Sequence, residues 1–231
     1  MGIDTDRQFE GNLGIMTPAE WERMSFQRVL VVGLGGLGGH VAAGLARLGV
    51  RSLVLVDFDR FDASNLNRQL YATHATIGKY KAEVLYDELK KIRSGIDLEV
   101  HYVRIEDLDP AIFDRVDMIV DAVDAIPTKR YLETMATVHD RPLLHGAVGG
   151  WYGQIGVLSP GSQLLNDLYA GADEGIERDL GSPTFTPAVV ANMMLAEFVK
   201  HVLKRPGVVL DEIMMVDLLH HDYRVVARRK R

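Results

Sequence analysis

The chain has 231 residues, enough for one substantial hydrophobic core, and its 47% hydrophobic and 25% charged residues are ordinary for a globular protein. It has no cysteine, which excludes disulfides, thiolate zinc sites and a thiol nucleophile, and its formal net charge of -6 argues against nucleic-acid binding. No apolar run approaches the roughly 20 residues needed to cross a bilayer, and the first residues lack signal-peptide character, so we expect a cytoplasmic protein with no membrane contact.

The chain begins with a polar arm of residues 1–27, in which one short helix is predicted over Thr17–Met24. Thr17 is a suitable N-cap, and Glu20 completes the pattern of a capping box. A continuous apolar run follows at Val29–Val32, and such a run is typical of a parallel strand that is buried on both faces.

The middle of the chain alternates further apolar runs with helical patterns. The predicted strands are Ser52–Val56, Leu98–Val103, Met118–Asp121, Pro142–His145 and Gln154–Leu158. The predicted helices between them are Gly39–Leu48, Lys79–Ile92 and Pro127–His139. Because alternating strands and helices imply right-handed crossovers, we predict an α/β fold with a Rossmann-like, mostly parallel sheet and helices on both faces.

The last third of the chain departs from this alternation. Residues 161–187 are rich in Gly, Asp, Ser and Pro, and a long irregular segment of this kind in a compact domain is usually functional or mobile. A largely apolar helix is predicted over Ala188–Lys204, followed by an antiparallel hairpin of Glu212–Leu219 and Tyr223–Ala227. We therefore predict a single domain over residues 1–231, with a core of residues 28–160 and a C-terminal helix and hairpin of residues 188–231.

A glycine-rich turn follows the first predicted strand and leads into a helix. Its glycines are Gly33, Gly35, Gly36 and Gly38. Glycine at these positions lets the backbone turn sharply and bring N–H groups close to phosphate oxygens at the helix N-terminus. Asp57 ends the next strand, roughly 20 residues after Gly38, where a carboxylate commonly binds ribose hydroxyls. The pattern indicates a nucleotide, and by itself it fits NAD as well as ATP.

Two cations and two amides follow Asp57 along the chain, namely Asn65, Arg68, Gln69 and Lys81. A triphosphate is a polyanion, and holding it in a bent conformation requires cations as well as backbone amides. Arg68 offers a planar fork and Lys81 a point charge, so this set favours ATP over a nicotinamide nucleotide. By sequence position alone, Asp59 and Asp62 are typical turn formers.

Asp121 and Asp124 lie at the end of another buried strand, at the edge of the sheet where ligands bind. Mg²⁺ prefers oxygen ligands, so a carboxylate there can hold it against phosphates. Asp124 lies further into the crevice and is the favoured ligand, with a capping or orienting role as the alternative for Asp121. His145 is interpreted as a packed residue, and His220–His221 as part of a hairpin turn.

Together these residues resemble the signature of the HesA/MoeB/ThiF family, the bacterial relatives of ubiquitin-activating E1 enzymes, over nearly the whole chain. The matching segments are Gly33–Gly38, Val56–Asp59, Ser64–Gln69, Gly78–Lys81 and Asp121–Asp124, with Arg7 and Gln8 similar to the family's N-terminal Arg-Gln. The resemblance implies that ATP is bound by Gly33, Gly35, Gly36, Gly38, Asp57, Asp59, Asn65, Arg68, Gln69 and Lys81. It implies catalytic roles for Arg7, Arg68, Lys81 and Asp124, with Mg²⁺ on Asp124. It also implies a homodimer in which Arg7 reaches into the neighbouring subunit's site, with residues 161–187 as a crossover loop.

Two departures from the family pattern limit what this resemblance implies. Many members carry two Cys-x-x-Cys pairs for structural zinc and a further cysteine on the crossover loop, and this chain has no cysteine. Zinc is therefore not expected, and no thioester, persulfide or acyl-disulfide can form on the chain. The Asn that usually follows the Mg²⁺ aspartate in the family is Ala125 here, so one polar contact is lost.

The expected activity is ATP-dependent adenylation of the C-terminal Gly-Gly carboxylate of a small ubiquitin-like sulfur carrier protein, with release of pyrophosphate. Such a step belongs to sulfur transfer of the thiamine or molybdopterin type, and the sulfur would come from a separate donor. An NAD-dependent oxidoreductase and the family branch that activates a tRNA-bound carboxylate are alternatives. A catalytically inactive, nucleotide-binding E1-like partner subunit is a further alternative, which Ala125 and the missing thiols leave open.

Overall fold

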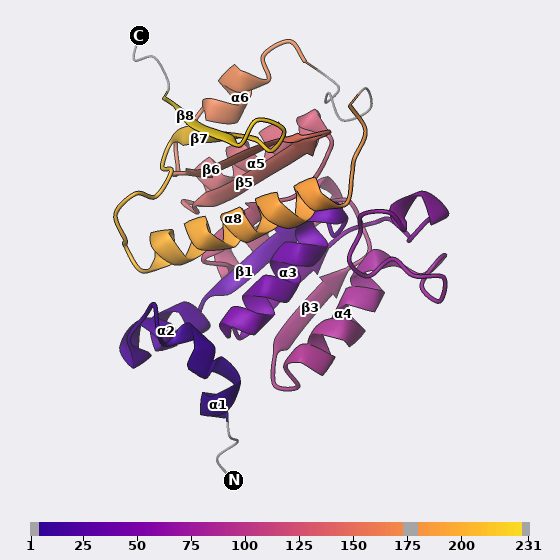
Figure 1. The fold of residues 1–231 in the computed structure, drawn as a ribbon, viewed down its shortest axis with the longest axis vertical. Coiled ribbons are helices and arrows are strands. Elements are labelled where there is room, and N and C mark those ends of the chain that lie inside the picture. Colours follow the sequence, from indigo (N-terminus) through magenta and orange to yellow (C-terminus); the bar gives the residue numbers. More distant parts are fainter. Residues whose placement is uncertain (1–4, 173–179, 228–231) are drawn as a thin grey trace.

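The computed structural model of the chain describes residues 5–172 and 180–227 and contains one sheet of eight strands. The strands are β1 (Arg28–Val32), β2 (Ser52–Val56), β3 (Asp97–His101), β4 (Met118–Asp121), β5 (Leu143–Gly149), β6 (Tyr152–Leu158), β7 (Glu212–Asp217) and β8 (Asp222–Ala227). They lie in the order β3-β2-β1-β4-β5-β6-β7-β8 (Figure 1). Strands β1 to β5 are parallel, whereas β6, β7 and β8 are antiparallel to their neighbours. The predicted mostly parallel sheet with a C-terminal antiparallel hairpin is confirmed.

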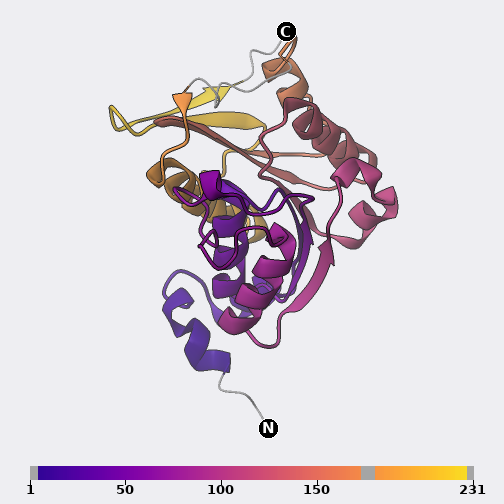
Figure 2. The ribbon, with the colours of Figure 1, turned by 90° about the vertical axis from the view of Figure 1, so that its right-hand side faces the viewer.

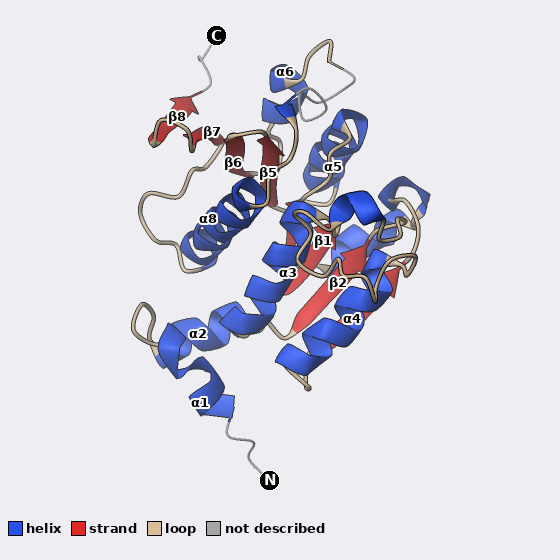
Figure 3. Ribbon diagram, turned by 45° about the vertical axis from the view of Figure 1, so that its right-hand side comes forward, coloured by secondary structure: helices blue, strands red, loops and turns tan. Residues whose placement is uncertain are grey.

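Helices cover both faces of the parallel part of the sheet. Figure 3 shows α3 (Gly36–Leu48), α4 (Lys81–Ile92) and α8 (Phe185–Val202) on one face and α5 (Ile126–Val138) on the other. In β1, Val29 and Val31 belong to the core beneath α3, α4 and α8, whereas Leu30 and Val32 belong to the core beneath α5. Because side chains alternate between the two faces of a strand, a strand covered on both sides is apolar throughout. Within the described ranges, no helix has the length and apolar character that crossing a bilayer requires.

The N-terminal segment packs at one end of the molecule, opposite the β7–β8 hairpin (Figures 1 and 2). It contains α1 (Thr5–Phe9), which the sequence pattern did not predict, and α2 (Pro18–Ser25). The predicted capping box of α2 is confirmed, because the Glu20 N–H donates to Thr17 Oγ1 at 3.3 Å and the Thr17 N–H donates to Glu20 Oε2 at 2.8 Å. Each side chain thus satisfies an amide that the first turn of a helix otherwise leaves unpaired.

Several element boundaries differ from the sequence prediction. Helix α3 begins at Gly36, inside the glycine-rich turn, and β5 continues to Gly149, because its last residues pair with the antiparallel β6. A short helix, α6 (Leu164–Leu168), lies in the segment that was predicted to be irregular. The carboxylate of Glu133 in α5 accepts the backbone N–H groups of Leu165 and Asn166, both at 2.9 Å, so a residue distant in sequence fixes the start of this helix.

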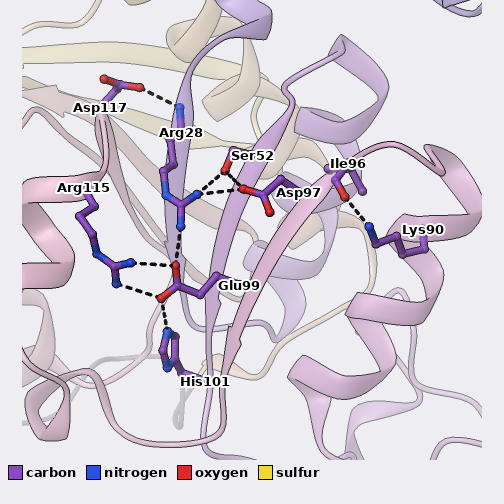
Figure 4. A network of polar contacts seen from close by, with 9 residues as sticks. All are labelled: Arg28, Ser52, Lys90, Ile96, Asp97, Glu99, His101, Arg115 and Asp117. Carbon is purple, nitrogen blue, oxygen red and sulfur yellow. Dashed lines mark hydrogen bonds and ion pairs between the residues drawn. The ribbon is translucent and has the colours of Figure 1, made fainter.

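A network of charges joins the amino ends of the first three strands in the sheet order (Figure 4). Arg28 of β1 donates to Ser52 of β2 at 2.7 Å and pairs with Asp97 of β3 at 2.9 Å. Arg28 also pairs with Glu99, to which Arg115 donates at 2.9 Å. These side chains are partly exposed to water, and pairs of this kind each contribute about 0–1 kcal/mol to stability. The network fixes strand register at the edge of the sheet opposite the site described next.

Candidate functional site

A cavity of about 390 Å³ lies at the carboxyl edge of the sheet, between the ends of β1, β2 and β4. Strand order reverses at β1, since β2 and β3 lie on one side of it and β4 and β5 on the other. In open parallel sheets, ligands bind in the crevice at such a reversal. The predicted site residues that line the cavity are Gly33, Gly35, Gly36, Asp57, Asp59, Arg68, Gln69, Lys81 and Asp124. Arg7, Gly38 and Asn65 are not part of its lining.

The glycine-rich turn needs glycine for two different reasons. Gly33 has a positive φ of 83°, and a Cβ there would lie 2.7 Å from the Ala122 carbonyl oxygen. A Cβ on Gly38 would lie 1.7 Å from the Gly33 carbonyl oxygen, so Gly38 acts by letting α3 pack closely against the turn. Helix α3 starts after Gly35, which has no side chain to cap it. The N–H groups of its first turn therefore have no side-chain cap and lie at the cavity, where the helix dipole favours an anion.

Asp57 lies at the end of β2 and is 7% exposed. Its Oδ2 accepts the Leu34 N–H at 2.6 Å and its Oδ1 accepts the Asp59 N–H at 2.8 Å. Burial raises the pKa of the Asp57 carboxyl, although the Lys81 ammonium and the two N–H donors oppose this. Each carboxylate oxygen can accept a further hydrogen bond, so the group is suited to a pair of ribose hydroxyls.

Lys81 and Arg68 bring positive charge to the wall of the cavity. Lys81 is at the start of α4, and its Nζ donates to Asp59 Oδ2 at 2.9 Å while its side chain is only 8% exposed. Arg68 Nη1 donates to the Ser64 carbonyl at 2.9 Å and to Asn67 Oδ1 at 3.0 Å. An ammonium has three donors and a guanidinium five, so both groups keep donors for a ligand. Asp59 thus lines the cavity as the partner that holds Lys81.

Gln69 and Asn65 lie close in sequence but are placed differently. Gln69 is 8% exposed and lines the cavity, and in the described part of the chain its buried Oε1 has no hydrogen-bond partner. A buried acceptor of this kind has capacity for a hydroxyl or amino donor of a ligand. Asn65 Oδ1 instead accepts the Asp62 N–H at 3.1 Å, and Asp62 caps the same short turn through the Ser64 N–H at 2.9 Å. In this structure Asn65 therefore shapes the loop that carries Arg68 and Gln69.

Asp124 is exposed at the mouth of the cavity, in the turn between β4 and α5. Among the described residues, no three carboxylate or imidazole groups are close enough together to hold a metal ion. Mg²⁺ is commonly bound by one or two carboxylates together with substrate phosphates and water. A single carboxylate beside a cationic, glycine-rich pocket fits that pattern, so Asp124 would hold Mg²⁺ only together with a polyphosphate.

A buried charge cluster lies behind this turn, and it includes Lys129, which the sequence pattern did not predict as a site residue. Asp121, Lys129 and His145 are each at most 1% exposed. Lys129 Nζ donates to Asp121 Oδ1 at 3.2 Å and to the Gly146 carbonyl at 3.0 Å, and His145 Nδ1 lies 2.7 Å from Asp121 Oδ2. Asp121 Oδ1 also accepts the Val123 N–H at 3.3 Å, which confirms the orienting role considered for Asp121. The cluster fixes the turn that presents Asp124.

The charges in this cluster determine one another's protonation. Burial alone would raise the pKa of Asp121, but the Lys129 ammonium and the His145 ring hold it below its usual range. Burial lowers the pKa of His145, although the nearby Asp121 carboxylate opposes this shift. The imidazole is therefore neutral at pH 7. Lys129 could have been found from its position, because it shares a helix face with the apolar Leu132 and Ala136 at spacings of three and seven.

Arg7 lies far from the cavity of its own chain. It is exposed in α1, whose neighbour Gln8 donates to the Ile92 carbonyl at 2.6 Å, at the C-terminal end of α4. Asn12 donates to the Arg47 carbonyl at 3.1 Å, near the C-terminal end of α3. Since α3 and α4 both start at the cavity, their other ends lie at the opposite edge of the sheet. Within one chain, the structure therefore does not bring Arg7 together with Arg68, Lys81 and Asp124.

The chain is similar in sequence to a known protein family and to several named proteins. The ThiF family matches residues 6–231. The chain is 30% identical over 225 residues to the probable adenylyltransferase/sulfurtransferase MoeZ of Mycobacterium tuberculosis, a match that covers 90% of this chain and 56% of MoeZ. It is 32% identical over 132 residues to the NEDD8-activating enzyme E1 catalytic subunit of Caenorhabditis elegans, covering 57% of this chain and 31% of that protein. The chain thus spans little more than half the length of MoeZ and less of the E1 subunit.

Solved structures show the same fold at lower sequence identity. Escherichia coli MccB in complex with ATP superposes with a TM-score of 0.73 and 20% identity, covering 90% of this chain and 65% of that chain. PaaA superposes with a TM-score of 0.79 and 16% identity, covering 98% of this chain and 84% of that chain. The arrangement of a parallel sheet, covering helices and C-terminal antiparallel strands is therefore shared with these proteins.

Proposed function

Because the chain belongs to the ThiF family, we propose that it is an E1-like adenylyltransferase that uses ATP and Mg²⁺ to activate the C-terminal carboxylate of a small ubiquitin-like sulfur carrier protein. The proposed setting is cytoplasmic sulfur transfer of the thiamine or molybdopterin type. Support for the reaction class comes from relatives that carry the name adenylyltransferase, among them MoeZ.

One observation carries the proposal, namely the meeting of an uncapped helix start, two cations and a carboxylate in one cavity. Lys81, Arg68 and the first turn of α3 provide donors for phosphate oxygens. Asp124 provides an oxygen ligand for a phosphate-bound Mg²⁺. Asp57 lies beside them at the end of β2, in a position suited to ribose hydroxyls. A cluster of cations of this kind has no evident role in hydride transfer to a nicotinamide.

The proposed reaction needs little from the protein beyond alignment and charge. An oxygen of the carrier's terminal carboxylate forms a bond to the α-phosphorus of ATP. The bond from that phosphorus to the oxygen bridging to the β-phosphate breaks, and the electron pair leaves with pyrophosphate. The attacking carboxylate is already ionised at pH 7, so no general base is required. Arg68 and Lys81 stabilise the charge on the phosphoryl oxygens, and bound Mg²⁺ would neutralise the leaving pyrophosphate.

The proposal extends to three partners. The carrier would present a flexible Gly-Gly tail, crossed by a loop of residues 161–187, of which residues 173–179 lie outside the described part of the chain. A second copy of the chain would supply Arg7, which lies too far from its own cavity to act there, as the contacts of Gln8 with the end of α4 and of Asn12 with the end of α3 indicate. Since the chain has no cysteine, the sulfur would come from a separate donor protein that attacks the acyl-adenylate.

The test is ATP–pyrophosphate exchange with the full chain and a carrier encoded beside it, shorter than about 100 residues and ending in Gly-Gly. We expect exchange that requires both Mg²⁺ and the carrier, and no exchange with a carrier lacking its last two glycines. Lys81→Ala and Arg68→Ala should each remove most of the exchange, by a factor of about 100 or more, because each withdraws a cation from the phosphoryl charge. Lys79→Ala, which changes an exposed lysine outside the cavity lining, is the matched control.

The outcomes separate the alternatives. ATP binding without exchange with any encoded Gly-Gly carrier would favour a catalytically inactive partner subunit. Binding of NAD with no binding of ATP would favour an oxidoreductase. Full exchange by the Arg7→Ala protein would show that Arg7 of a second copy takes no part.

A further inference from the structure

The segment of residues 180–184, which precedes α8, is held between two distant parts of the chain. In the turn between β5 and β6, the Gly150 N–H donates to the Gly181 carbonyl at 2.8 Å. On its other side, the segment meets Asn67 in the loop that follows β2, and the Ser182 carbonyl accepts a hydrogen bond from Asn67 Nδ2 at 2.9 Å. A side chain 115 residues earlier in the chain therefore holds this segment.

The side chain of Asn67 also makes a hydrogen bond to its neighbour Arg68. Asn67 Oδ1 accepts from Arg68 Nη1 at 3.0 Å, and the Ser64 carbonyl accepts from the same nitrogen at 2.9 Å. Since Nη1 carries two hydrogens, these two acceptors fix one side of the planar guanidinium. In the part of the chain that the structure describes, no group accepts a hydrogen bond from Arg68 Nε or Nη2, so these nitrogens are available to a ligand in the cavity.

The residue type at position 67 matches this pair of hydrogen bonds. An amide has an acceptor as well as donors, whereas a carboxylate has no donor and an ammonium has no acceptor. Asn67 is exposed, so packing does not explain why an amide is found there. Arg68 and Ser182 both line the cavity, although Asn67 does not. A side chain outside the cavity thus joins two parts of the cavity wall.

We propose that Asn67 is a positioning residue, which holds the Arg68 guanidinium in the orientation that meets the nucleotide phosphates and links it to the wall at Ser182. The inference rests on the proposed function, in which Arg68 stabilises phosphoryl charge. A long side chain that moves freely must be ordered when a ligand binds, and this ordering weakens binding. Asn67 orders the guanidinium beforehand, so its effect on nucleotide binding passes through Arg68.

The first experiment is calorimetric titration of the full chain with Mg²⁺–ATP, comparing the wild type with Asn67→Ala, Arg68→Ala and the double variant. Asn67→Ala should weaken binding about 2- to 10-fold, the range for one hydrogen bond. In the Arg68→Ala background, the same change should have no further effect, because the group that Asn67 orients is gone. Asn192→Ala is the matched control, since it changes an exposed asparagine that donates to the Ala188 carbonyl of its own helix and lies outside the cavity lining.

Hydrogen exchange of the Gly150 N–H gives a second readout, because this N–H can exchange when the Gly181 carbonyl moves away from it. Asn67→Ala should accelerate this hydrogen exchange about 2- to 10-fold, since the segment loses one hydrogen bond. Arg68→Ala keeps the bond from Asn67 to Ser182 and should leave the rate unchanged. Asn67→Gln has the same amide on a longer side chain, so it should restore most of the Mg²⁺–ATP affinity and most of the protection that Asn67→Ala loses.

Each outcome bears on one part of the inference. Equal loss of affinity from Asn67→Ala in the wild-type and Arg68→Ala backgrounds would indicate a general loosening of the loop and would overturn the positioning role. Unchanged affinity in Asn67→Ala, or no recovery in Asn67→Gln, would overturn it as well. Unchanged hydrogen exchange at Gly150 in Asn67→Ala would overturn the link to Ser182. Neither readout requires turnover, so the inference is tested even if the chain catalyses no ATP–pyrophosphate exchange. Absence of Mg²⁺–ATP binding by the wild type would overturn the inference together with the proposed function.

Discussion

The helices that start at the cavity and helix α2, on the opposite edge of the sheet, begin in opposite ways. Helix α2, far from the cavity, has a complete capping box between Thr17 and Glu20. Helices α3 and α5 start at the cavity after Gly35 and Ala125, and neither has a side-chain cap. Both of these N-cap residues line the cavity. Since the first N–H groups of a helix need partners, the helices that surround the cavity have theirs available for a ligand, whereas α2 satisfies its own.

A helix start without a side-chain cap needs another means of support, and α5 shows one. The beginning of α5 is fixed from behind by the cluster of Asp121, Lys129 and His145, which is buried in the fold. The partly exposed charge network at the amino ends of the strands has a different role, because it holds strand register where water reaches the charges (Figure 4). Disrupting the first cluster should cost much stability because its charges are buried. Disrupting the second network should change stability little because water reaches its charges.

The largest expected effect comes from breaking the support of α5. Lys129→Met leaves the Asp121 carboxylate buried without its ammonium partner, so the free energy of unfolding should fall by about 3–5 kcal/mol in urea denaturation. Adding Asp121→Asn to this variant removes the uncompensated charge and should recover part of the loss. A decrease below about 1 kcal/mol in the single variant would contradict the view that this cluster holds the turn.

The same cluster predicts how stability depends on pH. Burial lowers the pKa of His145 in the folded state, so between that value and the unfolded value of about 6.5 only the unfolded chain binds the proton. The contribution of His145 to the free energy of unfolding is therefore complete above pH 6.5. It decreases as the pH falls, with a slope of up to about 1.4 kcal/mol per pH unit. The His145→Asn protein should show a flatter curve below pH 6.5. His40 and His201, whose pKa values burial also lowers, are common to both proteins. Parallel curves would contradict the prediction.

A smaller effect is expected at the capped helix. Thr17→Ala removes the side-chain acceptor of the Glu20 N–H and should cost about 1 kcal/mol of unfolding free energy. Nucleotide affinity should not change, because α2 lies at the edge of the sheet opposite the cavity. Thermal unfolding measured with and without Mg²⁺–ATP gives both quantities, and a loss of nucleotide affinity would mean that the two ends are coupled.

The smallest effect is expected from adding a cap where the protein has none. Ala125→Asn places a capping side chain at the start of α5, whose backbone there is extended as an N-cap requires. Without nucleotide, the free energy of unfolding should rise by about 0.5–1 kcal/mol. No gain in urea denaturation would mean that these N–H groups are already satisfied, and the contrast with α2 would then have no functional meaning.

Local patterns predicted from the sequence agree well with the structure. The capping box at Thr17, the alternating elements and the run from Gly33 to Gly38 depend on neighbouring residues, so the sequence contains all the information they need. The cavity also unites Asp57, Arg68, Lys81 and Asp124, because the carboxyl ends of parallel strands meet at one edge.

Features that depend on tertiary contacts were not predicted. Lys129 meets Asp121 only because α5 packs against β4, and helix α6 is fixed by Glu133, which lies more than 30 residues earlier in the chain. Asn65 stays a predicted ligand-binding residue, but the hydrogen bond through which its amide oxygen caps a turn was not predicted. The side-chain direction of a loop residue depends on the loop's hydrogen bonds, which a linear pattern does not contain.

The central claim is that the cavity binds a metal-bound triphosphate through Lys81, Arg68 and the open start of α3. The most direct measurement is isothermal titration of the wild-type, Lys81→Ala and Lys79→Ala proteins with Mg²⁺–ATP and with NAD. We predict that the wild type binds Mg²⁺–ATP and not NAD, that Lys81→Ala loses about 1.5–3 kcal/mol of binding free energy, and that Lys79→Ala binds as the wild type does. Equal ATP affinity in the wild-type and Lys81→Ala proteins, or binding of NAD alone, would contradict the claim.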